Sequence, residues 1–307
     1  MLTITADSNE ICDLFDGDLR MKLAAGKFSK YSQIYSFTTE NLSGYLPQIP
    51  LNGARVLAVG GSGDTIVNTI MMGANEVVSF DINVLAGLYT DLKLAALQQL
   101  NFEDFKKFLM RQTENGGQNK QALDITVYEG LRSLVTYATA QFFDNAFSYY
   151  EGFGAAIRES PLFNNKHDTN LLKILSNPYL QTEKAYQKAK MALAGKKPLW
   201  ITSTAKSIAD KLAGTFDVIL LSNLTDYSPP NTFAKEVIAP LSARLKPRGI
   251  ICAAYVYETE PRAHHSQVDN PEIRRAIFGS LGLSYTERQF ESVIPEKKDA
   301  VILLGGK

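Results

Sequence analysis

The chain has only two cysteines among 307 residues, Cys12 and Cys252, which is too few for a disulfide framework. Cys252 lies in the apolar run IICAAYVY, where a buried and unreactive thiol is expected. No run reaches the roughly 20 apolar residues that span a bilayer, and the N-terminus lacks a stretch of signal-peptide character. These absences predict a cytoplasmic protein with at most peripheral membrane contact.

An excess of charge of either sign is also missing, because Lys plus Arg and Asp plus Glu each number 32. Without a net positive field, nucleic acid is a poor candidate partner. Only three histidines occur, and the adjacent His264 and His265 have no third ligand at metal spacing, so no metal site is expected. The 45% of hydrophobic residues instead indicates an ordinary folded protein with a large core.

Apolar runs alternate with helical patterns along most of the chain. Short apolar runs at 56–59 and 76–81 are each followed by a helical stretch, 64–72 and 84–100. Later strands are expected at 198–204, at 216–224 and in IICAAYVYE, and the closing segments LSYTERQFES and AVILLGG have the pattern of an antiparallel pair. The pattern predicts an α/β fold built on a seven-stranded, mostly parallel sheet.

The second and third expected strands are separated by far more chain than one connecting helix needs. Residues 101–197 are rich in helical signals and contain no fixed-period repeat, so they predict a helical insertion that serves as a lid or acceptor subdomain. Its aromatic residues Phe142, Phe143, Phe147, Tyr149, Tyr150 and Phe153 favour a helix core over an apolar acceptor tunnel. The expected division is a covering segment 1–50, a Rossmann-like domain 51–100 and 198–307, and this insertion.

The stretch VLAVGGSGDTIVNTI has a glycine-rich turn between the first strand and the first helix. A dinucleotide fold would have G-x-G-x-x-G, but here Gly61-Ser62-Gly63 is followed by Asp64, and the third glycine is missing. A carboxylate at the helix N-terminus repels a pyrophosphate and can hold an ammonium group. The loop therefore fits S-adenosylmethionine (SAM), which has an ammonium group and no phosphate.

Polar residues follow three of the expected strands, at the edge where ligands of open parallel sheets bind. Asp81 ends the second strand, where it can accept hydrogen bonds from ribose hydroxyls, although it can also cap the helix near Val84. Ser203 and Thr204 follow the third strand and are candidates for adenine contact or for capping the next helix. The fourth strand is followed by Ser222, Asn223 and Asp226.

Several stretches resemble the bacterial SAM:diacylglycerol 3-amino-3-carboxypropyltransferases, which make the homoserine head group of betaine lipids. The resemblance lies in VVSFDINVLAGLYTDLKLAALQQLNFEDFKKFL, NPYLQTEKAYQKAKMALAGK and FDVILLSNLTDY, and Tyr31-Ser32-Gln33 is similar to the family's Y-x-Q signature. It covers about residues 31–256 and implies a class I SAM-methyltransferase-like Rossmann fold. After Gln33 the family usually carries Trp-Glu-Asp-Pro, whereas this chain reads IYSFT and is shorter.

The resemblance implies transfer of the 3-amino-3-carboxypropyl group of SAM to an acceptor hydroxyl or amine, with release of methylthioadenosine. The acceptor is an unknown small molecule or a diacylglycerol-like lipid. The alternatives are a small-molecule methyltransferase and a SAM-binding scaffold without catalysis. Asp226, which can instead cap the following helix, is the candidate base, with Tyr31 second. The expected donor-binding residues are Gln33, Gly60, Gly61, Ser62, Gly63, Asp64, Asp81, Ile82, Asn83, Ser203, Thr204, Ser222 and Asn223.

Overall fold

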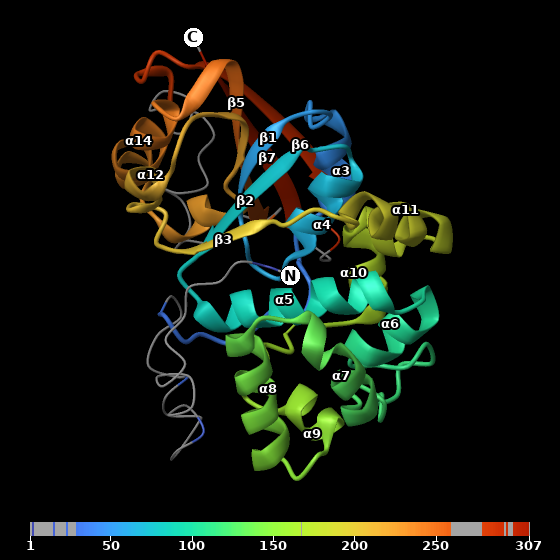
Figure 1. Cartoon of the computed structure of the whole chain (residues 1–307). Helices are drawn as coiled ribbons and strands as arrows, with labels where there is room; N and C mark the ends of the chain where they lie inside the picture. Colours follow the sequence, from blue (N-terminus) through green and yellow to red (C-terminus); the bar gives the residue numbers. More distant parts are fainter. Residues whose placement is uncertain are drawn as a thin grey trace.

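The structure is a computed structural model, and it describes residues 2, 15, 23, 29–166, 168–258, 278–291, 293 and 297–306. Its centre is one sheet with the strand order β3-β2-β1-β4-β5-β7-β6 (Figure 1). The first four strands in the chain are Arg55–Val59 (β1), Glu76–Asp81 (β2), Leu199–Thr202 (β3) and Phe216–Leu220 (β4). They pair in parallel with one another and with Leu245–Glu258 (β5). The predicted α/β fold with a parallel sheet is confirmed.

The two C-terminal strands run against this parallel set. Lys297–Gly305 (β7) pairs antiparallel with β5, and Ser284–Glu291 (β6) pairs antiparallel with β7. The closing antiparallel pair predicted from the alternating sequence is thus present. One boundary differs from expectation, because β5 begins at Leu245, before the predicted strand IICAAYVYE.

Helices cover the sheet and build the region beside it. Asp64–Met71 (α4) follows β1, and Val84–Gln99 (α5) follows β2. The remaining helices are Leu42–Tyr45 (α3), Phe102–Leu109 (α6), Ile125–Leu131 (α7), Tyr137–Tyr149 (α8), Gly154–Glu159 (α9), Asn170–Ser176 (α10), Glu183–Leu193 (α11), Ile208–Lys211 (α12), Pro230–Phe233 (α13) and Ala239–Ser242 (α14). Helices α6 to α11 all lie between α5 and β3 in the chain. None of the described helices is long and apolar enough to cross a membrane.

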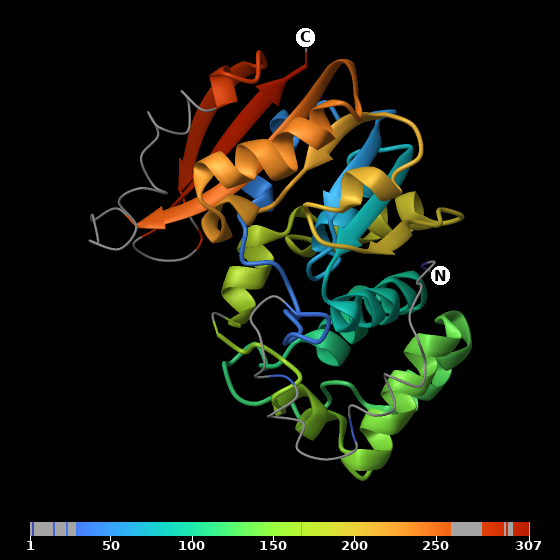
Figure 2. The same ribbon diagram turned by 90° about the vertical axis from the view of Figure 1, so that its left-hand side faces the viewer.

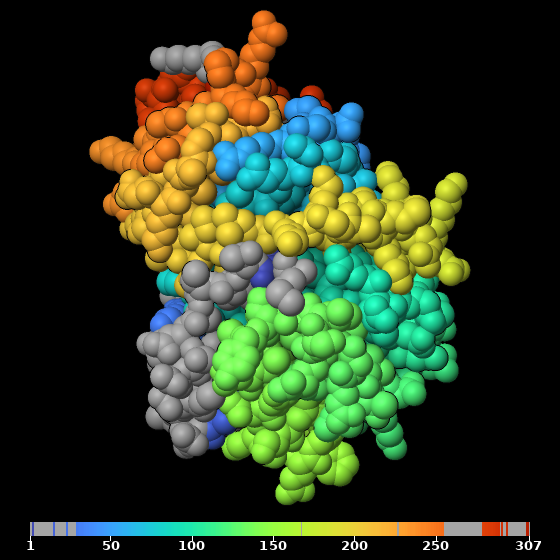
Figure 3. Space-filling model, viewed as in Figure 1, coloured from blue at the N-terminus to red at the C-terminus, as the bar shows by residue number. Residues whose placement is uncertain are grey.

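Figure 2 shows α7, α8 and α9 at the end of the molecule remote from β6 and β7, with α5 between them and the sheet. The space-filling view shows these green insertion residues as one continuous block below the sheet region (Figure 3). Phe142, Phe143 and Phe147 are buried, as the core interpretation predicted. Tyr149 and Phe153 are 50% and 67% exposed, so the outer aromatic residues of the set lie at the surface.

The core lies on both faces of the sheet, because alternate residues of each parallel strand point to opposite sides. In β1, Val56 and Ala58 pack with α4, α5 and the insertion, whereas Leu57 packs on the other face. There it contacts the cluster that contains Ile208 of α12 and Leu241 of α14. Burial on both faces explains why the strands read as continuous apolar runs instead of alternating patterns.

Candidate functional site

The glycine-rich turn lies at the carboxyl end of β1, between the ends of β2 and β4. The Gly60 N–H donates to the Phe80 carbonyl, 2.8 Å away, which ties the turn to the end of β2. Gly61 and Gly63 have φ angles of +49° and +83°, a left-handed conformation that side chains disfavour. The turn therefore needs glycine at both positions to pass from β1 into α4.

Two of the glycines are required for different reasons. A Cβ atom on Gly60 would lie 2.2 Å from the ring of Trp200, a buried residue of β3, so packing alone demands glycine there. A Cβ atom on Gly61 would meet nothing within 4 Å. The space next to Gly61 is thus open, whereas the space next to Gly60 is filled by Trp200. A ligand can therefore approach the turn at Gly61.

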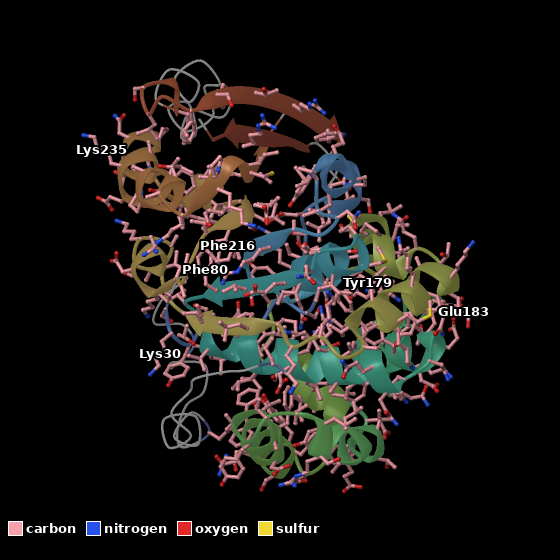
Figure 4. All side chains as sticks on the ribbon, turned by 45° about the horizontal axis from the view of Figure 1, so that its top comes forward. Lys30, Phe80, Tyr179, Glu183, Phe216 and Lys235 are labelled. Atoms are coloured by element: carbon pink, nitrogen blue, oxygen red, sulfur yellow. The ribbon has the colours of Figure 1, made fainter. Side chains whose placement is uncertain are left out.

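Asp81 lies directly beside this open position. Its carboxylate accepts hydrogen bonds from the N–H groups of Gly61 and Asn83, at 3.0 and 2.9 Å. Burial raises the pKa of Asp81 to about 6, against the lowering effect of these backbone donors. Figure 4 labels the preceding residue, Phe80, at the end of β2. The helix-capping alternative falls to Asn83, whose side chain accepts from Leu85 N–H at 3.1 Å.

Asn83 also fastens the N-terminal segment to this edge. Its side-chain amide donates to the Ser32 carbonyl at 3.0 Å and its side-chain oxygen accepts from Ser32 N–H at 3.2 Å. Tyr31 is thereby held near Asp81 and packs against the core. Gln33 instead donates to the carbonyls of Pro161 and Phe163, which lie in the insertion. The side chains of Gln33 and Asn83 are thus occupied by protein partners.

Asp64, assigned above to a donor ammonium, has its partners within the protein. The fully buried carboxylate accepts from Lys93 Nζ at 2.9 Å, Tyr179 OH at 2.8 Å, Ser62 Oγ at 2.7 Å and Thr38 N–H at 2.6 Å. Tyr179 reaches it from the 3₁₀ turn before α11 (Figure 4). The ammonium group at Asp64 therefore belongs to Lys93, and the assignments of Asp64 and Ser62 are corrected to a structural network.

The residues that follow β3 form a local turn. Thr204 Oγ1 accepts from Ser207 N–H at 3.2 Å in this turn, and Ser207, not Ser203 or Thr204, is the N-cap residue of α12. Ser203 is buried, its hydroxyl donates to the Thr204 carbonyl, and its N–H donates to the Asp81 carbonyl at 2.9 Å. Ser203 thus supports Asp81 through the backbone, and Ile82 lies between Asp81 and Asn83 at the same strand end.

The residue that the sequence did not predict is Glu40, which lies at the end of β4. Ser222 has a left-handed φ of +54° and its hydroxyl donates to Oε1 of Glu40. Glu40 is only 6% exposed, and burial raises its pKa. Asn223 N–H donates to the same carboxylate. Asp226 lies in the adjoining 3₁₀ turn, and its side chain is outside the described part of the structure.

The described part of the chain contains no group of three His, Cys, Asp or Glu residues arranged to hold a metal ion. His167, His264 and His265 lie outside the described residues. What the described site offers is a glycine turn with one open side and carboxylates at the ends of β2 and β4. Such an arrangement can accept hydrogen bonds from hydroxyl groups and hold a cation.

No family model matches the chain, and no curated protein matches it. Among solved structures it is similar to magnesium protoporphyrin IX methyltransferase from Synechocystis PCC 6803 with bound SAM, at 12% identity and a TM-score of 0.40 over 100% of both chains. It is also similar to PigF with bound SAH, at 10% identity and a TM-score of 0.41 over 97% of this chain and 59% of that one. At these values the correspondence is partial, and the proposals below depend on the chain's own residues.

Proposed function

We propose that the chain is a SAM-dependent transferase that binds the donor at the carboxyl ends of β1, β2 and β4. The observation that carries the proposal is Asp81, an uncompensated carboxylate hydrogen-bonded to Gly61 at the open side of the glycine turn. An ionised carboxylate has about four acceptor positions, so it can accept from ribose hydroxyls in addition to its backbone donors. An antiparallel pair closing a parallel sheet, as β6 and β7 do here, also matches the class I methyltransferase pattern.

The donor is a better fit than a dinucleotide for two reasons. The turn lacks the third glycine of the dinucleotide pattern, and Asp64 stands at the first position of α4. Lys93 neutralises that carboxylate, but both side chains are buried at the place where a pyrophosphate would sit. A ligand without phosphate is therefore favoured at this turn.

The group transferred is proposed from the resemblance to the 3-amino-3-carboxypropyltransferases. An acceptor hydroxyl or amine attacks the γ-carbon of the methionine moiety, the bond from that carbon to sulfur breaks, and methylthioadenosine leaves. The acceptor proton passes to a base, for which Asp226 and Tyr31 remain the candidates. The acceptor is a small molecule or a diacylglycerol-like lipid, admitted beneath the N-terminal segment and the helical insertion.

Methyl transfer is the second candidate, because the sheet pattern alone suits either group. In that reaction the acceptor attacks the methyl carbon and S-adenosylhomocysteine leaves. Which carbon reacts depends on which C–S bond lies in line with the nucleophile at about 3 to 3.5 Å. The nucleoside product therefore distinguishes the two reactions.

The experiment has two stages. Titration calorimetry with SAM tests donor binding, and incubation with SAM plus hydroxyl and amine acceptors, including diacylglycerol in micelles, tests turnover. Methylthioadenosine as the acceptor-dependent product supports aminocarboxypropyl transfer, and S-adenosylhomocysteine supports methyl transfer. Binding without either product favours a scaffold that has lost catalysis. Absence of donor binding would refute the proposal.

A further inference from the structure

Glu40 is a buried carboxylate at the end of β4 whose described partners are all neutral. Its two oxygens accept from Ser222 Oγ and from Tyr45 OH, the latter at 2.8 Å, and Asn223 N–H is a third donor. No cation within the described ranges forms an ion pair with it. A carboxylate buried without a cation is costly, so such groups are commonly retained for binding.

Two other buried carboxylates, Asp64 and Asp168, are already compensated. Asp64 pairs with Lys93, and Asp168 pairs with both Arg158 and Lys173 at 2.6 Å. Asp64 therefore has no free charge to offer a ligand ammonium group. Glu40, on the β4 side of the turn, has no cation partner among the described residues.

The position of Glu40 also suits the length of the donor. Asp81 ends β2, and Ser222 follows β4, while β1 with its glycine turn lies between these two strands. Neighbouring strands are about 4.8 Å apart, so the ends of β2 and β4 are roughly 10 Å apart. A SAM molecule with its ribose at Asp81 and its chain extended across the turn directs its amino-acid end toward β4.

We infer that Glu40 binds the α-ammonium group of the donor, at a subsite completed by Ser222 and Asn223. This inference depends on the proposed function, because it takes the ribose to lie at Asp81. Three of about four acceptor positions on the carboxylate are filled by neutral donors, so one remains for the ammonium group. Ser222 holds its hydroxyl on Glu40 from a left-handed backbone, a strained arrangement that is typical of ligand sites.

The test compares two ligands on two proteins. Methylthioadenosine has the adenosine portion of SAM but no ammonium group. We expect Glu40→Gln to weaken SAM binding about 10- to 100-fold, as for a lost hydrogen bond to a charged group, and to leave methylthioadenosine binding unchanged. Glu76→Gln, which removes an exposed carboxylate at the start of β2, is the matched control and should change neither affinity.

The outcomes separate the inference from the proposed function. Unchanged SAM affinity in Glu40→Gln, or equal weakening of both ligands, overturns the inference while leaving donor binding established. Failure of the wild-type protein to bind either ligand refutes the proposed function, and the inference with it. If Glu40→Gln does not fold, the wild-type protein is titrated with a SAM analogue whose amino group is replaced by hydrogen. Affinity equal to that for SAM overturns the inference, and a loss of at least tenfold supports it.

Discussion

Two pairs of largely buried carboxylates, Asp64 with Asp168 and Asp81 with Glu40, differ in what compensates their charge. Asp64 and Asp168 are paired with lysine and arginine side chains inside the protein. Asp81 and Glu40 accept hydrogen bonds only from neutral groups of the described chain. The first pair joins the insertion and the N-terminal segment to the sheet, whereas the second pair lies where strands β2 and β4 end. The paired carboxylates hold elements of the fold together, and the proposed donor site uses the two that have no cation partner among the described residues.

The paired set forms one buried network. Arg158 donates to Asp168, to Ser36 and to Asn165, each at 2.6 Å, and Lys173 contacts the other Asp168 oxygen. The ring of Phe37 lies between Lys93 and Lys173, whose ammonium nitrogens are 4.1 and 5.1 Å from its centre. Burial lowers the pKa of Lys173 to about 8, and Asp168 opposes that shift.

The largest expected effect is on stability, from Asp168→Ala. The change leaves Arg158 and Lys173 buried without their carboxylate, and breaking a buried pair costs about 3 to 5 kcal/mol. Urea denaturation measures the loss. The control Glu236→Ala breaks an exposed pair with Lys206 and should cost less than about 1 kcal/mol. Equal losses in the two variants would contradict the assignment of the network to folding.

Asp81→Asn should mainly lower donor affinity and have little effect on folding stability. We expect donor affinity to fall about 10- to 100-fold, because an amide replaces the charged acceptor for the ribose. Folding stability should fall by no more than about 1 kcal/mol, because the buried charge that the variant removes has no cation partner. Calorimetric titration and urea denaturation of the same samples measure both quantities. Donor affinity that equals the wild-type value would remove the ribose assignment.

The two glycines allow a finer comparison within the turn. Gly60→Ala brings a methyl group against the Trp200 ring, and overpacking of this kind costs about 1 to 3 kcal/mol. Gly61→Ala meets no neighbour and costs about 1 to 2 kcal/mol from its left-handed backbone alone. We compare the loss of donor affinity with the loss of folding stability in each variant. This ratio should be larger for Gly61→Ala than for Gly60→Ala. The reverse ranking would place the ligand elsewhere.

The pH dependence gives the smallest effect and depends on the pKa of Asp81, which burial raises to about 6. Between pH 7 and pH 5 the carboxylate of the free protein becomes protonated, so donor affinity should fall, by about tenfold at pH 5. The contribution of Asp81 to folding stability changes with pH in the opposite direction to donor affinity. Because its folded pKa lies above its unfolded value, that contribution is present at low pH and is lost as the pH rises through 6. A flat affinity between pH 5 and 7 would contradict the prediction.

The sequence predicted the parts of the fold that depend on local pattern. Apolar runs bounded by glycine located β1 and β2, and the excess chain after residue 81 located the insertion. Asp81 was identifiable because strand ends in a parallel sheet meet at one edge. The turn at Thr204 is also local, since the partner of its hydroxyl is three residues away.

The long-range partners were not predictable in the same way. The carboxylate of Asp64 is compensated by Lys93, which is 29 residues away, and by Tyr179, which is 115 residues away. Glu40 accepts a hydrogen bond from Ser222, which is 182 residues away. The motif at residues 60–64 therefore predicted a glycine turn at the end of β1, but not that Asp64 is paired with a buried lysine. A lysine inside the otherwise apolar face of LKLAALQQL was the one available signal for a buried ion pair.

Asn83 couples the order of the chain at Asp81 to the N-terminal segment, because only Ile82 separates Asn83 from Asp81 in the chain. Its amide bonds with Ser32, together with the Val84 N–H bond to the Lys30 carbonyl at 2.9 Å, hold residues 30–32 against the start of α5. Local opening of that segment breaks these bonds and exposes their amide hydrogens to solvent. A ligand that orders residues 81–83 should therefore slow hydrogen exchange at Ser32 and Val84, so the amide of Ser32 reports occupancy of a site that Ser32 itself need not touch.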